Sequence, residues 1–171
     1  MKPHDSETRW RARRAMATAL VWAMAASAMA AGGAGGGAGL GSGEASAEYQ
    51  QAVAAIKAEH WPEAIALLEP YVNKARNDAD GHNWLAYAYR KSGQLEPAFA
   101  HYRRALQINP THLGAHEYMG EAYLQAGQPD QAEVHLRELA RICAANCEEY
   151  ADLKQALTRY RTKLAAAPAK P

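Results

Sequence analysis

The chain has little of what enzymes use for catalysis. Its few serines are Ser6, Ser27, Ser42, Ser46 and Ser92, and none stands in a Gly-x-Ser-x-Gly turn. The glycine-rich run at 32–43 lacks the flanking strand and helix, and the lysine, of a phosphate-binding loop. The paired acids Glu148 and Glu149 stand at a predicted helix start, where the helix dipole favours acids in any protein. We therefore predict no catalytic residue and no cofactor.

An excess of charge of one sign is also missing. The formal net charge of the whole chain is +1. Residues 1–30 carry five basic and two acidic side chains and contribute +3, so the remainder carries −2. Proteins that bind nucleic acid present a basic patch to its phosphates. A nearly neutral, slightly acidic remainder excludes a nucleic-acid partner.

The N-terminus has the pattern of an export signal. A basic stretch holds Lys2, Arg9, Arg11, Arg13 and Arg14, and the uncharged run 15–31 follows it. Ala28-Met29-Ala30 offers a small-x-small cleavage site, so we predict a signal peptide over 1–30 and a periplasmic or secreted protein. An uncleaved membrane anchor is the alternative, although the run is alanine-rich and short of the ~20 strongly apolar residues that usually span a membrane. A twin-arginine signal is favoured less. Residues 31–44 are glycine-rich and predict a flexible linker.

Cysteine occurs only at Cys143 and Cys147. Asn146 is predicted to cap the next helix, with Glu149 completing a capping box, so the two cysteines flank a turn. Neighbouring cysteines in an exported chain indicate a disulfide, whose small loop would contribute about 2 kcal/mol. Free or partner-linked thiols, or a metal or redox role, are alternatives. The redox role is favoured least, because Glu148 and Glu149 would stabilise the thiol over the thiolate.

One sequence period dominates the rest of the chain. It separates Ala64, Ala98 and Ala132, and it also separates Gly93 from Gly127 and Tyr89 from Tyr123. Within each period, apolar residues recur at intervals of three and four, which is typical of a helix with one buried face. A period of about 34 residues indicates a helix-turn-helix solenoid, whose units bury their apolar faces by stacking. The predicted fold is therefore an all-α solenoid.

These positions resemble the tetratricopeptide repeat. The second unit matches at Leu85, Ala86, Tyr89, Gly93, Ala98, Tyr102, Ala105 and Pro110. The third matches at Met119, Gly120, Tyr123, Gly127, Ala132 and Leu136, and departs at Leu139 and Ala144. The first matches at Ala52, Ile56, Trp61, Ala64, Leu68 and Tyr71. It has Glu59 in place of the usual glycine and Arg76 in place of the usual proline, so we expect an irregular inter-helix turn and exit there.

The domain organisation follows from this register. Repeats are predicted at 45–78, 79–112 and 113–146, forming a repeat domain over 45–164. Residues 147–164 carry apolar side chains at intervals of three and four and predict a helix that caps the last repeat. Residues 165–171 are predicted to be a disordered tail.

The resemblance implies a concave groove lined by the first helix of each repeat. The groove positions are Tyr49, Val53, Ile56 and Lys57, then Asn83, Tyr87, Arg90 and Lys91, then Glu117, Glu121, Leu124 and Gln125. Some relatives clamp a C-terminal carboxylate with asparagine and basic residues. Asn83, Arg90 and Lys91 resemble that set in part, but the nearby acids Glu117 and Glu121 disfavour it. Packing against the N-terminal segment is the alternative role of Tyr49 and Val53.

Histidines raise the question of metal binding. His112 and His116 have a spacing that could hold zinc on one helical face, but no third ligand is evident. Two histidine positions repeat with the period of the chain, His82 with His116 and His101 with His135. Equivalent positions in stacked repeats lie about 8–10 Å apart, too far to share a metal ion. We predict no metal site.

The functional hypothesis is an exported adaptor that binds a peptide or a partner helix in its groove. A self-associating scaffold, hence a homo-oligomer, is the first alternative. A metal or redox accessory protein that uses Cys143 and Cys147 is the second. Membrane contact is expected only if the N-terminal segment stays uncleaved.

Overall fold

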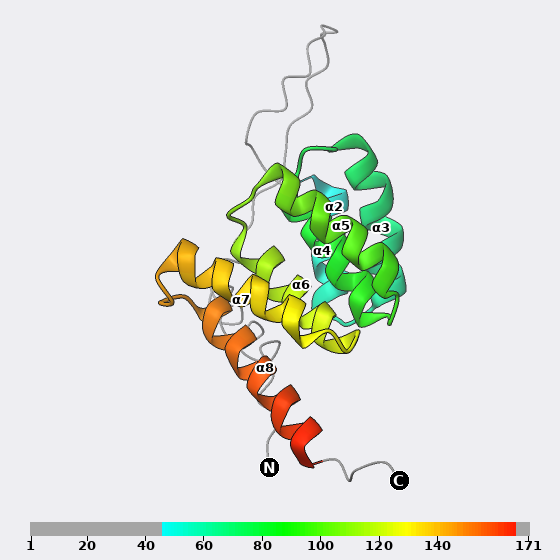
Figure 1. The fold of residues 1–171 in the computed structure, drawn as a ribbon. Coiled ribbons are helices and arrows are strands. Elements are labelled where there is room, and N and C mark those ends of the chain that lie inside the picture. The colour runs from blue at the N-terminus through cyan, green and yellow to red at the C-terminus, as the bar shows by residue number, and fades with distance from the viewer. Residues whose placement is uncertain (1–45, 167–171) are drawn as a thin grey trace, which may run out of the picture. The chain divides into compact units, whose positions relative to one another are not determined.

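A computed structural model of the chain describes residues 46–166, and within that range every regular element is an α-helix. The helices are α2 (Ala47–Lys57), α3 (Trp61–Lys74), α4 (Ala79–Lys91), α5 (Leu95–Ile108), α6 (Leu113–Gln125), α7 (Pro129–Cys143) and α8 (Glu148–Ala166), as Figure 1 shows. The predicted all-α solenoid of three hairpins with a capping helix is confirmed. The predicted signal peptide, the linker and residues 167–171 of the predicted tail lie outside the described residues.

The second and third hairpins repeat each other in register. Helix α6 starts and ends one full period after α4, and α7 starts one full period after α5. The turn inside each hairpin has a glycine with positive φ, +79° at Gly93 and +75° at Gly127. The Gly93 N–H donates to the Arg90 carbonyl and the Gly127 N–H to the Leu124 carbonyl, at 3.0 and 3.1 Å. The two glycines end their helices as the sequence predicts.

The expected irregularity of the first hairpin was wrong. Glu59 takes φ +60°, so a residue with a side chain occupies the conformation that glycine has in the other turns. Its N–H donates to the Ile56 carbonyl at 3.0 Å, in the same turn pattern. The exit near Arg76 is also regular, because the Asp78 N–H donates to the Ala75 carbonyl as the His112 N–H does to Asn109. The backbone bonds close the turn, and the penalty for a non-glycine residue there is about 1–2 kcal/mol.

Small residues set how closely the helices of a hairpin approach. Ala64, Ala98 and Ala132 are fully buried, and each lies in the first turn of a second helix. A larger side chain there would hold the two helices apart, because packed interiors have little free volume. The largest fully buried side chains are Tyr102, Leu68, Leu85, Leu139 and Leu153, which spread the core along the solenoid.

Helix α8 covers the end of the last repeat by packing on both α6 and α7. Its Leu153 and Leu157 join Leu124 and Leu139 in a buried cluster. The helix starts one residue later than predicted, at Glu148, which leaves Cys147 rather than Asn146 at the capping position. It also runs to Ala166, so residues 165 and 166 are helical rather than part of the tail. In Figure 1 the red end of α8 extends beyond the α6–α7 hairpin, and residues 161–166 are exposed.

Over residues 46–166, every helix falls short of the length and apolar character that crossing a membrane requires.

Candidate functional site

Four aromatic side chains gather around the first helices of the second and third repeats. We call Trp61, Trp84, Tyr87 and Tyr118 the aromatic cluster. The ring centroids of Tyr87 and Tyr118 lie 4.9 Å apart, and those of Trp84 and Trp61 lie 5.7 and 5.9 Å from the Tyr87 ring. Such separations are typical of favourable aromatic pairs. The cluster draws on α3, α4 and α6 and so bridges all three hairpins.

Two cations lie against this cluster. The Arg90 guanidinium lies 5.1 Å from the Tyr87 ring centroid and 5.8 Å from that of Tyr118. The Lys91 ammonium lies 5.5 Å from the Trp61 ring centroid. Both fall within the roughly 6 Å over which a cation is attracted to an aromatic face.

A buried ion pair joins the second repeat to the third. Arg90 Nη2 lies 3.0 Å from Glu121 Oε2, and both side chains are buried. Removing one partner of such a pair usually costs about 3–5 kcal/mol, because the other charge stays buried without compensation. Arg90 is therefore needed for the stacking of α4 and α6, which further disfavours its use as a carboxylate clamp.

Acidic side chains accumulate beside this ion pair. Glu117, Glu121 and Asp152 are all buried. Burial raises the pKa of Glu117 well above its usual range, and the neighbouring carboxylates of Glu121 and Asp152 raise it further, whereas Arg90 lowers it. Burial likewise raises the pKa of Tyr118, so its phenol stays protonated.

The predicted groove residues differ in where the structure places them. Tyr87, Arg90, Lys91 and Glu121 come together around the aromatic cluster. Among the first-repeat groove residues, the Tyr49 ring packs on Tyr71 of its own hairpin with centroids 5.1 Å apart. Lys57 and Gln125 are exposed, Tyr49, Val53 and Lys91 are half-buried, and the buried ones are Ile56, Asn83, Tyr87, Arg90, Glu117, Glu121 and Leu124.

Sequence reasoning missed Trp61, Trp84 and Tyr118 as members of this site. A signal existed for two of them, because Trp84 and Tyr118 occupy equivalent places in successive repeats and each directly follows a predicted groove residue. Trp61 opens α3, a second helix, so no rule about first helices would have found it.

Asn83 of α4 has a buried hydrogen-bond acceptor without a partner in the described part of the chain. The residue is 3% exposed. Its Oδ1 has no hydrogen-bond partner among the residues that the structure describes. Buried polar atoms without a partner are rare in folded proteins and call for an explanation.

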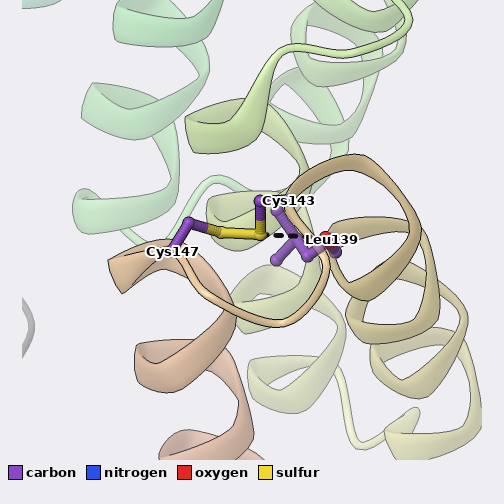
Figure 2. Close-up of a disulfide and its surroundings, with 3 residues drawn as sticks. All are labelled: Leu139, Cys143 and Cys147. Carbon is purple, nitrogen blue, oxygen red and sulfur yellow. Dashed lines mark hydrogen bonds between the residues drawn. A yellow bond between two sulfur atoms is a disulfide. The ribbon is translucent and has the colours of Figure 1, made fainter.

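The two cysteines are joined by a disulfide between the end of α7 and the start of α8 (Figure 2). Their Cα atoms lie 5.8 Å apart, within the usual range for such a bond. The Cys143 sulfur lies 3.0 Å from the Leu139 carbonyl oxygen. A disulfide sulfur has no proton, so this contact becomes a hydrogen bond only after reduction, when the thiol donates.

The HxxxH residues His112 and His116 do not converge on a common point. His112 Nδ1 accepts a hydrogen bond from the Ala115 N–H, and its Nε2 lies 3.1 Å from Asp80 Oδ1. His116 instead faces His135. Within residues 46–166, no three metal-ligating side chains lie close enough together to hold an ion.

Comparison with known proteins identifies the repeat. Residues 57–139 match the family model described as anaphase-promoting complex, cyclosome, subunit 3. Among curated proteins, the chain is similar to the E3 SUMO-protein ligase RanBP2 of Drosophila melanogaster, with 37% identity over 57 residues. That match covers 32% of this chain, and the chain spans 2% of the relative's length.

Solved structures show the same fold. The type III secretion chaperone SycD of Yersinia enterocolitica, in complex with a peptide of the translocator YopD, matches with TM-score 0.60 and 17% identity, over 68% of this chain and 92% of its own. The first TPR of Spaghetti (RPAP3), bound to the HSP90 peptide SRMEEVD, matches with TM-score 0.61 and 16% identity, over 70% and 91%. The Arabidopsis OM64 TPR domain matches with TM-score 0.61 and 18% identity, over 68% and 93%.

The repeat register, the helical hairpins with their glycine turns and these matches together lead to one conclusion: this chain is a tetratricopeptide-repeat protein.

Proposed function

We propose that the protein is an exported adaptor that binds an extended peptide or a partner helix at the aromatic cluster. The observation that carries the proposal is the cluster itself. Aromatic rings carried mainly by the first helices of stacked repeats, with the Lys91 ammonium at their edge, suit a segment that has apolar side chains and an acidic one. Two of the structural relatives, SycD and Spaghetti, were solved with peptides bound.

Photo-crosslinking of the full chain in its own cells tests the proposal. A photoreactive phenylalanine analogue replaces Trp84 in one protein and the exposed α5 residue Gln107 in a control. We expect position 84 to capture a protein partner that position 107 does not. The double substitution W61A/K91E should abolish that capture, because it removes one ring and one cation and leaves the Arg90–Glu121 ion pair in place.

Three other outcomes of the crosslinking experiment would contradict the proposal. Equal capture from positions 84 and 107 would show that the partner does not bind specifically at the aromatic cluster. Crosslinks from position 84 to a second copy of this chain alone would indicate the self-associating scaffold. Capture that W61A/K91E leaves unchanged would show that the cluster does not recognise the partner.

Export is the part of the proposal that rests on the N-terminal sequence alone. Mass determination of the protein from fractionated cells tests it. A periplasmic or secreted product that begins after Ala30 would support a cleaved signal peptide. A full-length product in the membrane fraction would indicate an anchor, and a full-length product in the cytoplasm would contradict export.

A further inference from the structure

Two pairs of histidines join the helices of the second and third hairpins. His82 of α4 faces His101 of α5, and His116 of α6 faces His135 of α7. In both pairs the two Nδ1 atoms lie 3.0 Å apart. The same sequence separation recurs in both repeats, so each pair closes its own hairpin rather than linking neighbouring repeats.

A backbone carbonyl determines how protons are arranged in each pair. His82 Nε2 lies 3.3 Å from the Arg76 carbonyl oxygen, and His116 Nε2 lies 3.0 Å from that of Pro110. A carbonyl can only accept, so Nε2 of both residues carries the proton. In the neutral ring Nδ1 is then an acceptor, and the facing Nδ1 of the partner histidine must donate.

The bond inside each pair is close to linear. Ring centroids are 5.3 Å apart in both pairs, whereas the bonded nitrogens are 3.0 Å apart. The centroid separation exceeds the nitrogen separation by about twice the distance from an imidazole centroid to its own Nδ1. Both Nδ1 atoms therefore lie on the line between the two centroids. A linear N–H···N bond between partly buried rings is favourable, and it has room for only one proton between the two nitrogens.

The surroundings of the first pair are mixed in charge. The charges of Arg104 and Asp78 act on the pKa of His82, and that of Glu69 acts on the pKa of His101. The Tyr89 ring lies against His101, with centroids 5.9 Å apart and an interplanar angle of 14°, and its hydroxyl donates to Glu69.

The second pair has a similar ring environment and different charges. The charges of Glu138, His112 and Arg141 act on the pKa of His116, and that of Glu138 also acts on the pKa of His135. The Tyr123 ring lies against His135 with centroids 5.6 Å apart. Glu138 occupies the place in the third repeat that Arg104 has in the second, so the two pairs have opposite charges at the equivalent position.

We propose that these two histidine pairs are an acid-sensitive lock that opens the α4–α5 and α6–α7 hairpins when they are protonated. A first proton can go to the unprotonated Nε2 of His101 or His135 and leaves the bond intact. A second proton in the pair has to go to Nδ1 of His82 or His116, where it meets the Nδ1–H of the partner ring. The linear bond is then replaced by two facing donors, and the two helices lose this hydrogen bond and gain a buried repulsion in its place. If the proposed function is right, acid also weakens partner binding, because α4 and α6 carry most of the aromatic cluster.

The expected pH dependence has a definite sign. Burial lowers the pKa of His82, His101 and His116, and burial together with the charge of His116 lowers the pKa of His135 to about 4. Histidine in the unfolded chain titrates near about 6.5, so between these values the unfolded state binds more protons. The contribution of the pairs to the free energy of unfolding is complete above about pH 6.5 and is lost as the pH falls toward the folded pKa values. Over that range the unfolding constant rises by up to about tenfold per pH unit for each histidine.

Urea unfolding of the full chain between pH 7.5 and 4.5 tests the lock. Two double variants, H82Q/H101Q and H116Q/H135Q, replace one pair each by amides that still hydrogen-bond and do not titrate. In each variant we expect the logarithm of the unfolding constant to change less steeply with pH. Between pH 6.5 and 5 the slope should fall by up to about two, because up to two fewer protons are taken up on unfolding. H60Q is the matched control, because the His60 side chain is exposed and bonds to Glu63 within its own helix turn.

Nitrogen NMR of the unmodified protein keeps the proposal testable if a double variant fails to fold. We expect protonated Nε2 in His82 and His116, protonated Nδ1 in His101 and His135, and titration midpoints of all four below about 6.5. Either of two results would overturn the lock: ordinary midpoints for all four residues, or pair variants whose pH dependence matches that of the unmodified chain.

Discussion

At the scale of single residues, backbone conformation decides what each inter-helix turn tolerates. Gly93 has φ +79° and nothing within 4 Å of where a Cβ would stand, so a side chain there meets strain without a clash. Glu59 takes φ +60° in the equivalent turn of the first hairpin, which shows that an inter-helix turn of this fold can bear the strain. The glycine at this position is therefore a contribution to stability rather than a requirement of the turn.

We predict that Gly93→Ala lowers the free energy of unfolding by about 1–2 kcal/mol, because alanine is strained in the left-handed conformation. Gly114→Ala is the matched control, since Gly114 lies in α6 without positive φ and a Cβ there makes only ordinary contacts. The control should be neutral or stabilising, by up to about 1 kcal/mol. Urea denaturation measures both, and equal effects at the two sites would contradict the role given to φ.

At the scale of helices, the close approach of α6 and α8 depends on a missing side chain. A Cβ at Gly120 would lie 2.5 Å from Cδ2 of Leu153, a fully buried residue. Ala86 occupies the equivalent place in the second repeat, where the next first helix packs instead. The capping helix therefore packs closer to α6 than a side chain at position 120 would allow.

We predict that Gly120→Ala destabilises the protein by about 1–3 kcal/mol through overpacking, which outweighs the gain of up to about 1 kcal/mol in helix propensity. Trimming the opposing residue should relieve the clash, so G120A/L153V should cost less than the sum of the two single variants. Thermal or urea unfolding of the four proteins forms the double-mutant cycle. Strict additivity would show that Leu153 moves aside freely and that the contact does not limit packing.

At the scale of the whole molecule, stability should vary along the solenoid. Each hairpin packs on its neighbours in the chain, so α4 and α5 have contacts on both sides, whereas α2 starts the described solenoid. Repeat arrays of this kind behave as a sum of unit stabilities and interface terms. Local opening therefore costs least at the ends.

We predict that amide hydrogen exchange at pH 7 is slowest in α4 and α5 and fastest in α2 and in residues 161–166. Residues 161–166 are exposed and extend past the packed part of α8. Exchange measured by mass spectrometry on peptides of the full chain gives the order directly. A single rate for all helices would contradict the gradient and would mean that the domain opens only as one unit.

Particular residues show which features of the fold and of the candidate site could be predicted from the sequence. The glycine turns at Gly93 and Gly127 were predictable because a left-handed conformation has a local sequence signal. The turn at Glu59 was not, because hydrogen bonds between neighbouring residues impose that conformation against the residue's own preference. Arg90 was found as a groove residue from the repeat register, but its partner Glu121 comes from the next repeat, and only stacking brings the two together.

The sequence by itself determined the repeat, its register, the hairpin boundaries and the small residues at helix crossings, since all of these depend on local periodicity and conformation. The tertiary structure alone decided the aromatic cluster, the Arg90–Glu121 ion pair, and the pairing of His82 with His101 and of His116 with His135. These features depend on the angle and distance at which helices pack. That geometry is a property of all the packed side chains together, and no single stretch of the sequence encodes it.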